Sequence, residues 1–313
     1  MALHTQIGGT LAPPRTPGRR RTSLSRRRAT LGIIYIAPAA VLLGLFFLWP
    51  LVRTVYISFF DYPILGPSTF IGVQNYVEAF QDSDFGQAVI FTIVYTLITT
   101  PVVLIVGFVL AALVRRRTRA ARIFQTVYFI PVVIGLAAAS YLWLFMWQPD
   151  IGPVTDLLSR LGLADSAVNL FAKFGTAFLI VLAMVTWKVA GLQMLLLLSG
   201  MQSIPEDVIE ASRMDGASRW QTFRHITLPL LRPTLALVLV FSVAGSLLAF
   251  DQFFIMTAGG PDNSTITAVF QIYRTGFVQF HLGYASALSI LLMLVLGAVS
   301  AVQMLLLRNS DNS

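Results

Sequence analysis

Two charged side chains interrupt long stretches of sequence that are otherwise apolar. Lys188 is the one charge within residues 174–199, and Asp251 is the one charge within residues 234–256. A charge in hydrocarbon is costly, so it marks a functional site by default, such as a path for a polar solute. Either residue could instead be structural, neutralised by the other or by a partner subunit. Both alternatives stay open at this point.

The segment 204–233 is a polar island between two apolar stretches, and it carries acidic residues, four arginines and His225. Its length, charge and patterning favour a surface on which another protein docks. A partnerless amphipathic hairpin lying on a membrane is an equal alternative on these residues alone.

Helix-start and helix-stop residues predict the local structure of this island. A first helix is expected over 205–215, because Pro205 suits a first helical turn and two acids follow it. Gly216 fits the C-terminal stop of that helix, and Ser218 fits the N-cap of a second short helix through His225. Two prolines then mark the return to the apolar sequence.

The composition of the 313-residue chain is that of an integral membrane protein. It is 56% hydrophobic, only 12% charged, and has a mean hydropathy of +0.76, whereas soluble domains carry about 25% charged residues. The chain has no cysteine, which excludes disulfides and thiolate metal sites, and its three histidines lie far apart. It also has no Gly-x-x-x-x-Gly-Lys-[Ser/Thr] loop with which to bind ATP.

Six apolar stretches exceed the roughly 20 residues that a helix needs to cross a bilayer. They lack the alternation of membrane strands, so they predict an all-α polytopic membrane protein with six transmembrane helices. Pro101 and Pro131 lie inside two of them and are expected to kink them. The six stretches are residues 31–52, 88–114, 123–147, 174–199, 234–256 and 283–307.

The basic residues predict the orientation in the membrane. Seventeen of the 22 lysines and arginines lie in segments that would share one side, so both termini and the polar island are expected in the cytoplasm. Residues 1–30 are expected to be a disordered basic tail that touches membrane lipid and no nucleic acid. Residues 31–307, including a loop over 200–233, would form the transmembrane domain, followed by a tail over 308–313.

The island carries Glu210-Ala211-Ser212, then Asp215-Gly216-Ala217, then Ile226-Thr227-Leu228-Pro229. This pattern resembles the signature loop of bacterial ABC importer permeases, with Ser212 where the family has a second alanine. Further runs resemble the carbohydrate branch of that family, in particular the larger permease of the maltose transporter. They are residues 70–76, 187–188, 257–261 and 280–287, so the resemblance spans about 31–307.

The resemblance implies a permease subunit in the plasma membrane of a prokaryote, forming half of the translocation path for a sugar or sugar-like solute. Its partners would be a second homologous permease, two cytoplasmic ATPase subunits that bind the ATP, and an extracytoplasmic solute-binding protein. The chain itself would be no enzyme and would hold no cofactor or metal. The residues implied to couple it to the ATPases are Glu210, Ala211, Asp215, Gly216, Ile226, Leu228 and Pro229.

The substrate path is expected near mid-membrane. Lys188 lies eleven residues before Ser199, roughly 16 Å along a helix, whereas Asp251 lies close to the outer end of its stretch, which argues against a direct pair. The implied path residues are Lys188, Gln193, Ser242, Ser246 and Asp251. A sugar, a polyol or a glycerol phosphoester all remain possible. The alternative function is a self-sufficient secondary carrier or channel for a small polar solute.

Overall fold

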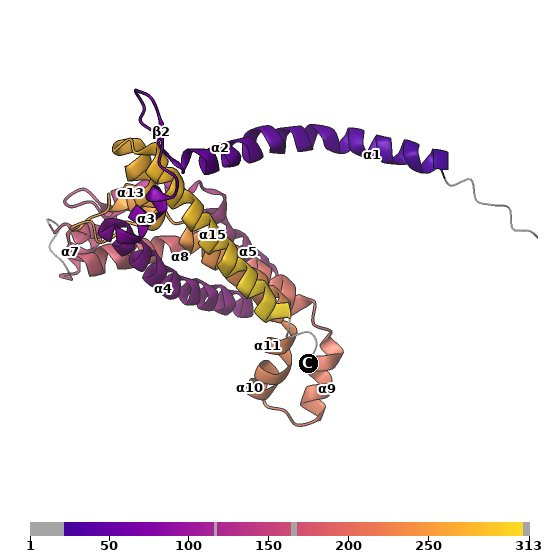
Figure 1. Ribbon diagram of the computed structural model, residues 1–313. Coiled ribbons are helices and arrows are strands. Elements are labelled where there is room, and N and C mark those ends of the chain that lie inside the picture. Colours follow the sequence, from indigo (N-terminus) through magenta and orange to yellow (C-terminus); the bar gives the residue numbers. More distant parts are fainter. Residues whose placement is uncertain (1–21, 116–117, 164–167, 309–313) are drawn as a thin grey trace, which may run out of the picture. The chain divides into compact units, whose positions relative to one another are not determined.

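The computed structural model describes residues 22–115, 118–163 and 168–308 of the chain. These residues fold almost entirely into helices, as predicted (Figure 1). The chain divides into two units, one ending at Arg53 and the other beginning at Thr54.

The N-terminal unit is built from helix. Helix α1 (Thr22–Leu43) leads into a π-helical segment, η1 (Gly44–Leu48), and then into α2 (Trp49–Ile57). Helix therefore begins at Thr22, inside the segment for which the composition predicts disorder, and residues 1–21 of that predicted tail lie outside the described residues. The π turn directly precedes Trp49 and Pro50, where the wider turn accommodates a proline within the helix.

The second unit begins with a small polar cap and continues as a helical bundle. The strands β1 and β2 pair antiparallel, with Phe60 opposite Phe70. The elements in chain order are β1 (Phe60–Asp61), β2 (Thr69–Phe70), α3 (Gln74–Gln81), α4 (Ser83–Leu113), α5 (Arg119–Val133), α6 (Leu136–Met146), α7 (Pro153–Arg160), η2 (Leu170–Ala172), α8 (Phe174–Gln202), α9 (Glu206–Met214), α10 (Arg219–Thr222), η3 (Phe223–Thr227), α11 (Leu228–Leu230), α12 (Arg232–Leu247), α13 (Asp251–Met256), α14 (Ala268–Tyr273), η4 (Arg274–Val278) and α15 (Leu282–Arg308).

Among the described residues, four helices are continuous, long and apolar enough to cross a membrane. They are Gly32–Ile57, Ser83–Leu113, Phe174–Gln202 and Leu282–Leu305. Two bent pairs bring the number of candidate spans to six: α5 with α6, bent by 98°, and Arg219–Leu230 with α12, bent by 69°. The all-α polytopic fold is thus confirmed, with two of its six spans broken.

Two of the stretches expected as single spans are interrupted: 123–147, where a proline kink was expected, and 234–256, where none was. The interruption of 234–256 is distinct from the 69° bend at Leu231. The first break follows Pro131, which lacks the N–H that a continuous helix needs. The second break separates α12 from α13, so 234–256 is wrong as one uninterrupted helix. At this break the Thr267 hydroxyl donates to the Ala249 carbonyl at 2.6 Å, in place of a helical N–H.

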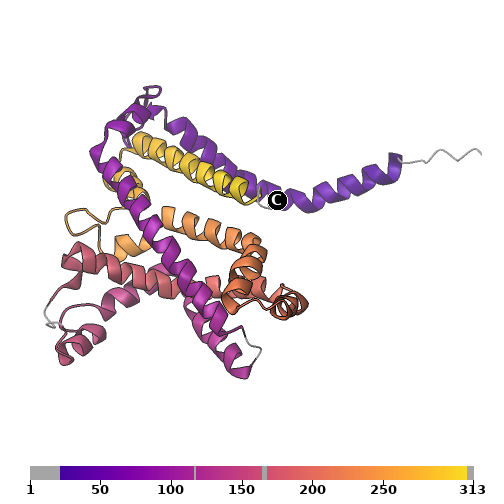
Figure 2. The ribbon, with the colours of Figure 1, turned by 90° about the horizontal axis from the view of Figure 1, so that it is seen from below.

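The bundle is centred on α8, which packs against α4, α5 and α12, while α6 packs against α13 (Figure 2). Glycines permit the closest crossings, as is common between membrane helices. A Cβ atom added at Gly191 would lie 2.0 Å from the Tyr128 carbonyl oxygen on α5. One added at Gly107 on α4 would lie 2.6 Å from the Cβ of Gln193 on α8.

The described residues form three apolar clusters, and two of them include residues of the central helix α8. The hairpin-side cluster includes Met194, Leu197, Leu231 and Val238, together with Ile209 of α9. The far-side cluster is dominated by aromatic rings, with centroids 4.9 Å apart for Tyr95 and Phe253, and it also contains Ala249 and Met184. Its members on α4 and α8 lie toward the N-terminal ends of those helices, so the two clusters occupy successive levels along the bundle.

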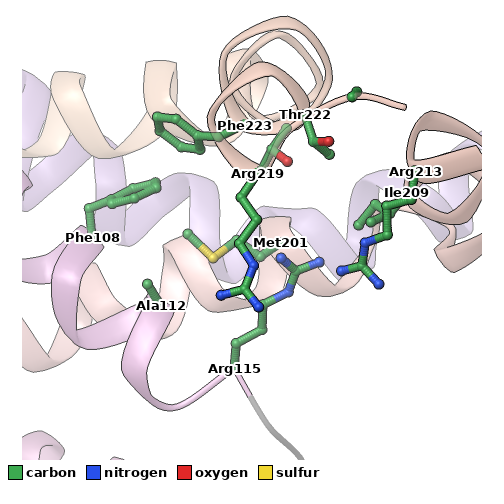
Figure 3. Close-up of a pocket in the computed structure, with 11 residues that line it drawn as sticks. Phe108, Ala112, Arg115, Met201, Ile209, Arg213, Arg219, Thr222 and Phe223 are labelled. Atoms are coloured by element: carbon green, nitrogen blue, oxygen red, sulfur yellow. The ribbon is translucent and has the colours of Figure 1, made fainter. Parts of the chain in front are cut away.

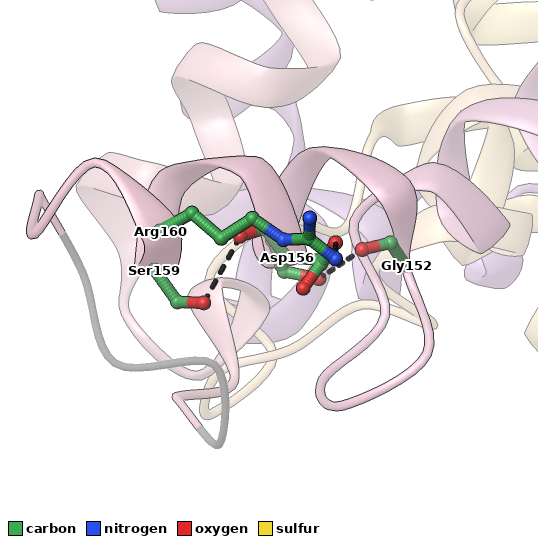
Figure 4. A network of polar contacts seen from close by, with 5 residues as sticks. Gly152, Asp156, Ser159 and Arg160 are labelled. Carbon is green, nitrogen blue, oxygen red and sulfur yellow. Dashed lines mark hydrogen bonds and ion pairs between the residues drawn. The ribbon is translucent and has the colours of Figure 1, made fainter.

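Two short helices lie beyond the bundle, α3 before the first long helix of the second unit and α7 after α6. On α7, Arg160 pairs with Asp156 at 2.9 Å, and the Asp156 N–H donates to the Gly152 carbonyl (Figure 4). Both side chains of the pair are exposed, so the ion pair contributes at most about 0.5 kcal/mol.

The substitution Gly191→Ala tests the crossing of α8 and α5. We expect it to destabilise the folded chain by about 1–3 kcal/mol, because the new methyl group overlaps a backbone carbonyl that cannot rotate away. Thermal unfolding of the purified protein measures the loss. Gly297→Ala on α15 is the control, since nothing lies within 4 Å of its added Cβ, and it should leave stability unchanged or raise it slightly. Equal stability of the two variants would contradict the packing described.

Candidate functional site

The polar island folds into a helical hairpin that projects from the bundle (Figure 1). Its first arm is α9, which begins after Pro205 and carries two acids in its first turn. Its second arm runs through α10, η3 and α11 without interruption. The hairpin agrees with the two helices expected on either side of Gly216.

The turn between the arms depends on the backbone of Gly216. Its φ of +80° lies in the left-handed region, which other residues adopt only with strain. The Gly216 N–H donates to the Arg213 carbonyl, and the Ala217 N–H donates to the Ser212 carbonyl at 3.0 Å. This pair of bonds is the Schellman ending of a helix. Nothing lies within 4 Å of a Cβ added at Gly216, so the requirement concerns conformation and not space.

Side chains hold the two arms together. The Ser218 hydroxyl caps α10 and the Gln221 side chain accepts from the Ser218 N–H, forming a reciprocal capping box. The buried hydroxyls of Ser212 and Thr222 lie 3.2 Å apart, which links α9 to α10. Ser212 is the residue that departs from the family triplet, and here its hydroxyl takes part in the contact between the arms.

The predicted coupling residues lie on the exposed face of this hairpin. Three of them, Ala211, Asp215 and Ile226, share a shallow groove of about 510 Å³ between the arms. Glu210 and Gly216 are exposed beside it. Large apolar side chains are exposed near the turn as well, with Met214 88% and Trp220 65% exposed. Such apolar exposure is typical of an interaction surface.

Leu228 and Pro229 lie further along the second arm, where the helix does not end as the prolines led us to expect. The arm passes through Pro229 and bends only at Leu231. The preceding π turn closes with the Leu228 N–H donating to the Phe223 carbonyl, and this wider turn accommodates the proline. The same arrangement precedes Pro50 in the N-terminal unit.

A polar layer separates the two apolar clusters of the bundle. It contains buried threonines of α4 and polar residues of α8, which lie between cluster residues of their own helices. It also contains serines of α12, which lie between Val238 of that helix and Ala249 just beyond its end. The layer consists of Thr96, Thr99, Thr100, Lys188, Gln193, Ser242 and Ser246. Four of the five predicted path residues therefore lie in one level of the bundle.

Lys188 is bound to the first helix break. It is 8% exposed, and its Nζ donates to the Val132 carbonyl at 3.0 Å. That carbonyl lies in the last turn of α5, where carbonyls have no partner within their own helix. A cation at a helix C-terminus is also favoured by the helix dipole. Lys188 thus stabilises the end of a half-helix in this conformation.

The other path residues have different surroundings. Gln193 donates to the Ser242 hydroxyl at 2.9 Å and joins α8 to α12, while Ser246 is buried nearby on α12. Asp251 begins α13 beyond the second break and is half-buried among the described residues. The structure therefore places Lys188 on a carbonyl and not on Asp251, as the depth difference led us to expect.

Three members of the polar layer, Thr96, Thr99 and Thr100, were not predicted from the sequence. Thr99 and Thr100 are buried on α4, and their hydroxyls have no hydrogen-bond partner among the described residues. The Gln193 side-chain oxygen likewise has no hydrogen-bond partner among the described residues. Threonine is common in apolar helices, and its hydroxyl bonds readily to the backbone of its own helix. Only the packing of α4 against α8 therefore distinguishes Thr99 and Thr100 from other threonines of the chain.

Residues 83–310 match the family described as the binding-protein-dependent transport system inner membrane component. The chain belongs to this family. It is therefore a multi-pass permease of a binding-protein-dependent ABC importer, and the alternative of a self-sufficient carrier is set aside.

Several permeases are similar along nearly their whole length. The sulfoquinovosyl glycerol transport system permease SmoG of Agrobacterium fabrum is 34% identical over 283 residues, covering 90% of this chain and 91% of that protein. The sn-glycerol-3-phosphate permease UgpA of Yersinia pestis is 33% identical, covering 87% and 92%. A solved bacterial importer of the acidic polysaccharide alginate has the same fold, with a TM-score of 0.80, 22% identity, and coverage of 93% and 99%.

Two substitutions at Gly216 test the hairpin turn of this permease. We expect Gly216→Ala to cost about 1–2 kcal/mol and to reduce coupled transport, because alanine resists a φ of +80°. Gly216→Asn should retain more function although its side chain is larger, since asparagine tolerates this conformation. Binding-protein-dependent uptake into proteoliposomes measures both variants. An asparagine variant worse than the alanine variant would show that space, and not backbone conformation, limits the position.

Lys188→Met tests the contact at the first helix break. Losing a charge-assisted hydrogen bond should destabilise the bundle by about 1.5–3 kcal/mol, which thermal unfolding of the purified permease can measure. Lys173→Met makes the same change at the exposed start of the same helix and should have little effect. If both variants unfolded at the same temperature, Lys188 would not hold the end of α5.

Proposed function

We propose that this permease forms half of the translocation path for a sugar or sugar-like solute and that its hairpin couples the path to partner ATPases. The main observation that supports this proposal is the structure of the hairpin. It presents the family motif on an exposed groove, held by a Schellman turn and a capping box. A rigid, exposed hairpin with apolar residues at its turn is suited to enter a cleft on another protein.

The orientation follows from charge. The hairpin and the basic segments before α1 and after α4 share one side if the six spans are crossed in order. The excess of arginine on that side supports a cytoplasmic placement of both termini and of the hairpin. The polar cap of β1, β2 and α3, together with α7, then faces outward, where a solute-binding protein would dock.

The partners are a second homologous permease, two cytoplasmic ATPase subunits and an extracytoplasmic solute-binding protein. ATP is bound by the ATPase subunits, because this chain has no phosphate-binding loop. The chain then acts without catalysing a reaction and without a cofactor of its own. Anionic lipid on the cytoplasmic face would contact its basic segments.

The solute class rests on the relatives and on the polar layer. Two relatives are named for a sulfoquinovosyl glycerol and for sn-glycerol-3-phosphate, and a third, from Thermoanaerobacterium thermosulfurigenes, for starch degradation products. Each of these solutes carries hydroxyl groups. The amide of Gln193 and the hydroxyls of Ser242 and Ser246 can bond to hydroxyls, and Lys188 adds one cation. A sugar, a polyol or a glycerol phosphoester fits this set.

In this conformation Lys188, Gln193 and Ser246 are buried and Ser242 is half-buried. Lys188 occupies the end of α5, and Gln193 joins α8 to α12. A movement of α12 would separate Ser242 from Gln193 and expose both to a solute. Because the second arm of the hairpin continues directly into α12, ATP-driven movement of the hairpin would reach this contact. Asp251, beyond the second break, would lie at the outer end of the same path.

Glu210→Ala tests the coupling role. We expect at least a tenfold loss of ATP-dependent uptake, because removal of an exposed carboxylate on the motif face weakens the contact with the ATPase. The amount of permease in the membrane should stay normal. Glu206→Ala is a matched control, as it removes an exposed carboxylate from the same helix outside the motif. Normal uptake by the Glu210 variant, or equal loss in both variants, would contradict the proposal.

A further inference from the structure

A cavity of about 420 Å³ lies at the base of the hairpin, where it shares Ala217 with the motif groove and contains none of the polar-layer residues (Figure 3). It is enclosed by the last turns of α4, the end of α8 and the inner sides of both hairpin arms. Its lining includes Ala217 and Thr227 of the motif runs, but none of the seven predicted coupling residues and none of the predicted path residues.

Three arginines from three different segments line this cavity. Arg115 follows the end of α4, Arg213 lies in the last turn of α9, and Arg219 begins α10. Figure 3 shows their guanidinium groups gathered at one end of the cavity. Within the described part of the chain, no acidic side chain forms an ion pair with any of them. Like charges repel at such a site, so an anion would relieve the repulsion.

The opposite end of the cavity is apolar. Phe108 and Phe223 meet there edge to face, with ring centroids 5.5 Å apart, and Ala112 and Met201 complete the surface. A free inorganic anion has no hydrocarbon portion that could pack against this apolar end. Guanidinium groups beside an apolar surface fit an amphiphile, in which a phosphate diester is joined to hydrocarbon chains.

The depth of the cavity agrees with such a ligand. Arg115 is the second residue beyond the apolar span Ser83–Leu113, so it lies where the hydrocarbon of the bilayer gives way to headgroups. Phe108 and Ala112 belong to the span itself. A phospholipid in the same leaflet would therefore present its phosphate to the arginines and its first methylene groups to the phenylalanines.

We propose that this cavity binds the phosphate of an anionic phospholipid from the leaflet on the hairpin side. The lipid joins the end of α4 to both hairpin arms through Arg115, Arg213 and Arg219, and so fixes the base of the hairpin against the bundle. The inference rests on the proposed function only in identifying that leaflet as the cytoplasmic one.

Native mass spectrometry of the purified full-length chain in detergent tests lipid binding without any ATPase, so failure here is distinct from failure of the coupling proposal. The lipids are dioleoyl phosphatidylglycerol and dioleoyl phosphatidylcholine, with inorganic phosphate as the soluble arm. We expect one phosphatidylglycerol to bind at least about tenfold more tightly than phosphatidylcholine, whose choline would meet the arginines. Millimolar inorganic phosphate should not displace it.

The cavity variant replaces Arg115, Arg213 and Arg219 by glutamine, and we expect it to lose at least about tenfold in affinity, since each charge-assisted bond contributes about tenfold or more. The matched control replaces three exposed arginines outside the cavity and should lose less than twofold. These are Arg119, Arg122 and Arg224. Ala112→Phe retains every charge but fills the apolar end, and it should weaken lipid binding even if the triple variant fails to fold.

Three results would overturn the proposal. Equal losses in the cavity and control variants would mean general attraction between basic residues and acidic lipid. Displacement of the lipid by inorganic phosphate would mean a site for free anions. Unchanged lipid binding in the cavity variant, with loss of ATPase association, would mean that the arginines meet an acidic side chain of the ATPase.

Discussion

A carbonyl group in hydrocarbon needs a hydrogen-bond donor, because no water is present to supply one. This constraint governs the two places where the membrane helices break. At the first, the Lys188 ammonium donates to the Val132 carbonyl, and at the second, the Thr267 hydroxyl donates to the Ala249 carbonyl. With both breaks satisfied, the short helices beyond them, α6 and α13, pack against each other and complete the far-side cluster. The broken spans are therefore part of the packing, and their polar supports lie beside the proposed path.

The polar layer has a related consequence. Large apolar and aromatic side chains hold the bundle at two levels, and between them the contacts are few, directional and polar. The bond between Gln193 and Ser242 can be exchanged for a bond to a solute hydroxyl at little net cost, whereas an interlocked apolar surface could not be opened so readily. In the proposed function, the same side chains would then close the path in one state and line it in another.

Residue types and apolar patterns predicted those features that depend only on residues close together in the sequence. Apolar length located the spans, and the residue types at Gly216 and Ser218 correctly located the turn and the cap of the hairpin. Pro131 predicted a kink but not a bend of 98°, because that angle depends on packing against α8 and α13. The partner of Lys188 is 56 residues away in the sequence, and no spacing rule reaches so far. Pro229 was misleading for a local reason, since a π turn lets a helix continue through a proline that would usually end it.

That continuity has a mechanical meaning. The second arm of the hairpin is one stiff rod from Arg219 to Leu230, and its whole change of direction, 69°, falls at Leu231. Leu231 is fully buried in the hairpin-side cluster, so it cannot shift sideways without disturbing its neighbours. The arm and α12 are thus two helices joined at an angle, and the buried Leu231 is the fixed point between them. In the proposed coupling, a force on the exposed tip would be redirected at Leu231 and would tilt α12, the helix that carries Ser242 and Ser246.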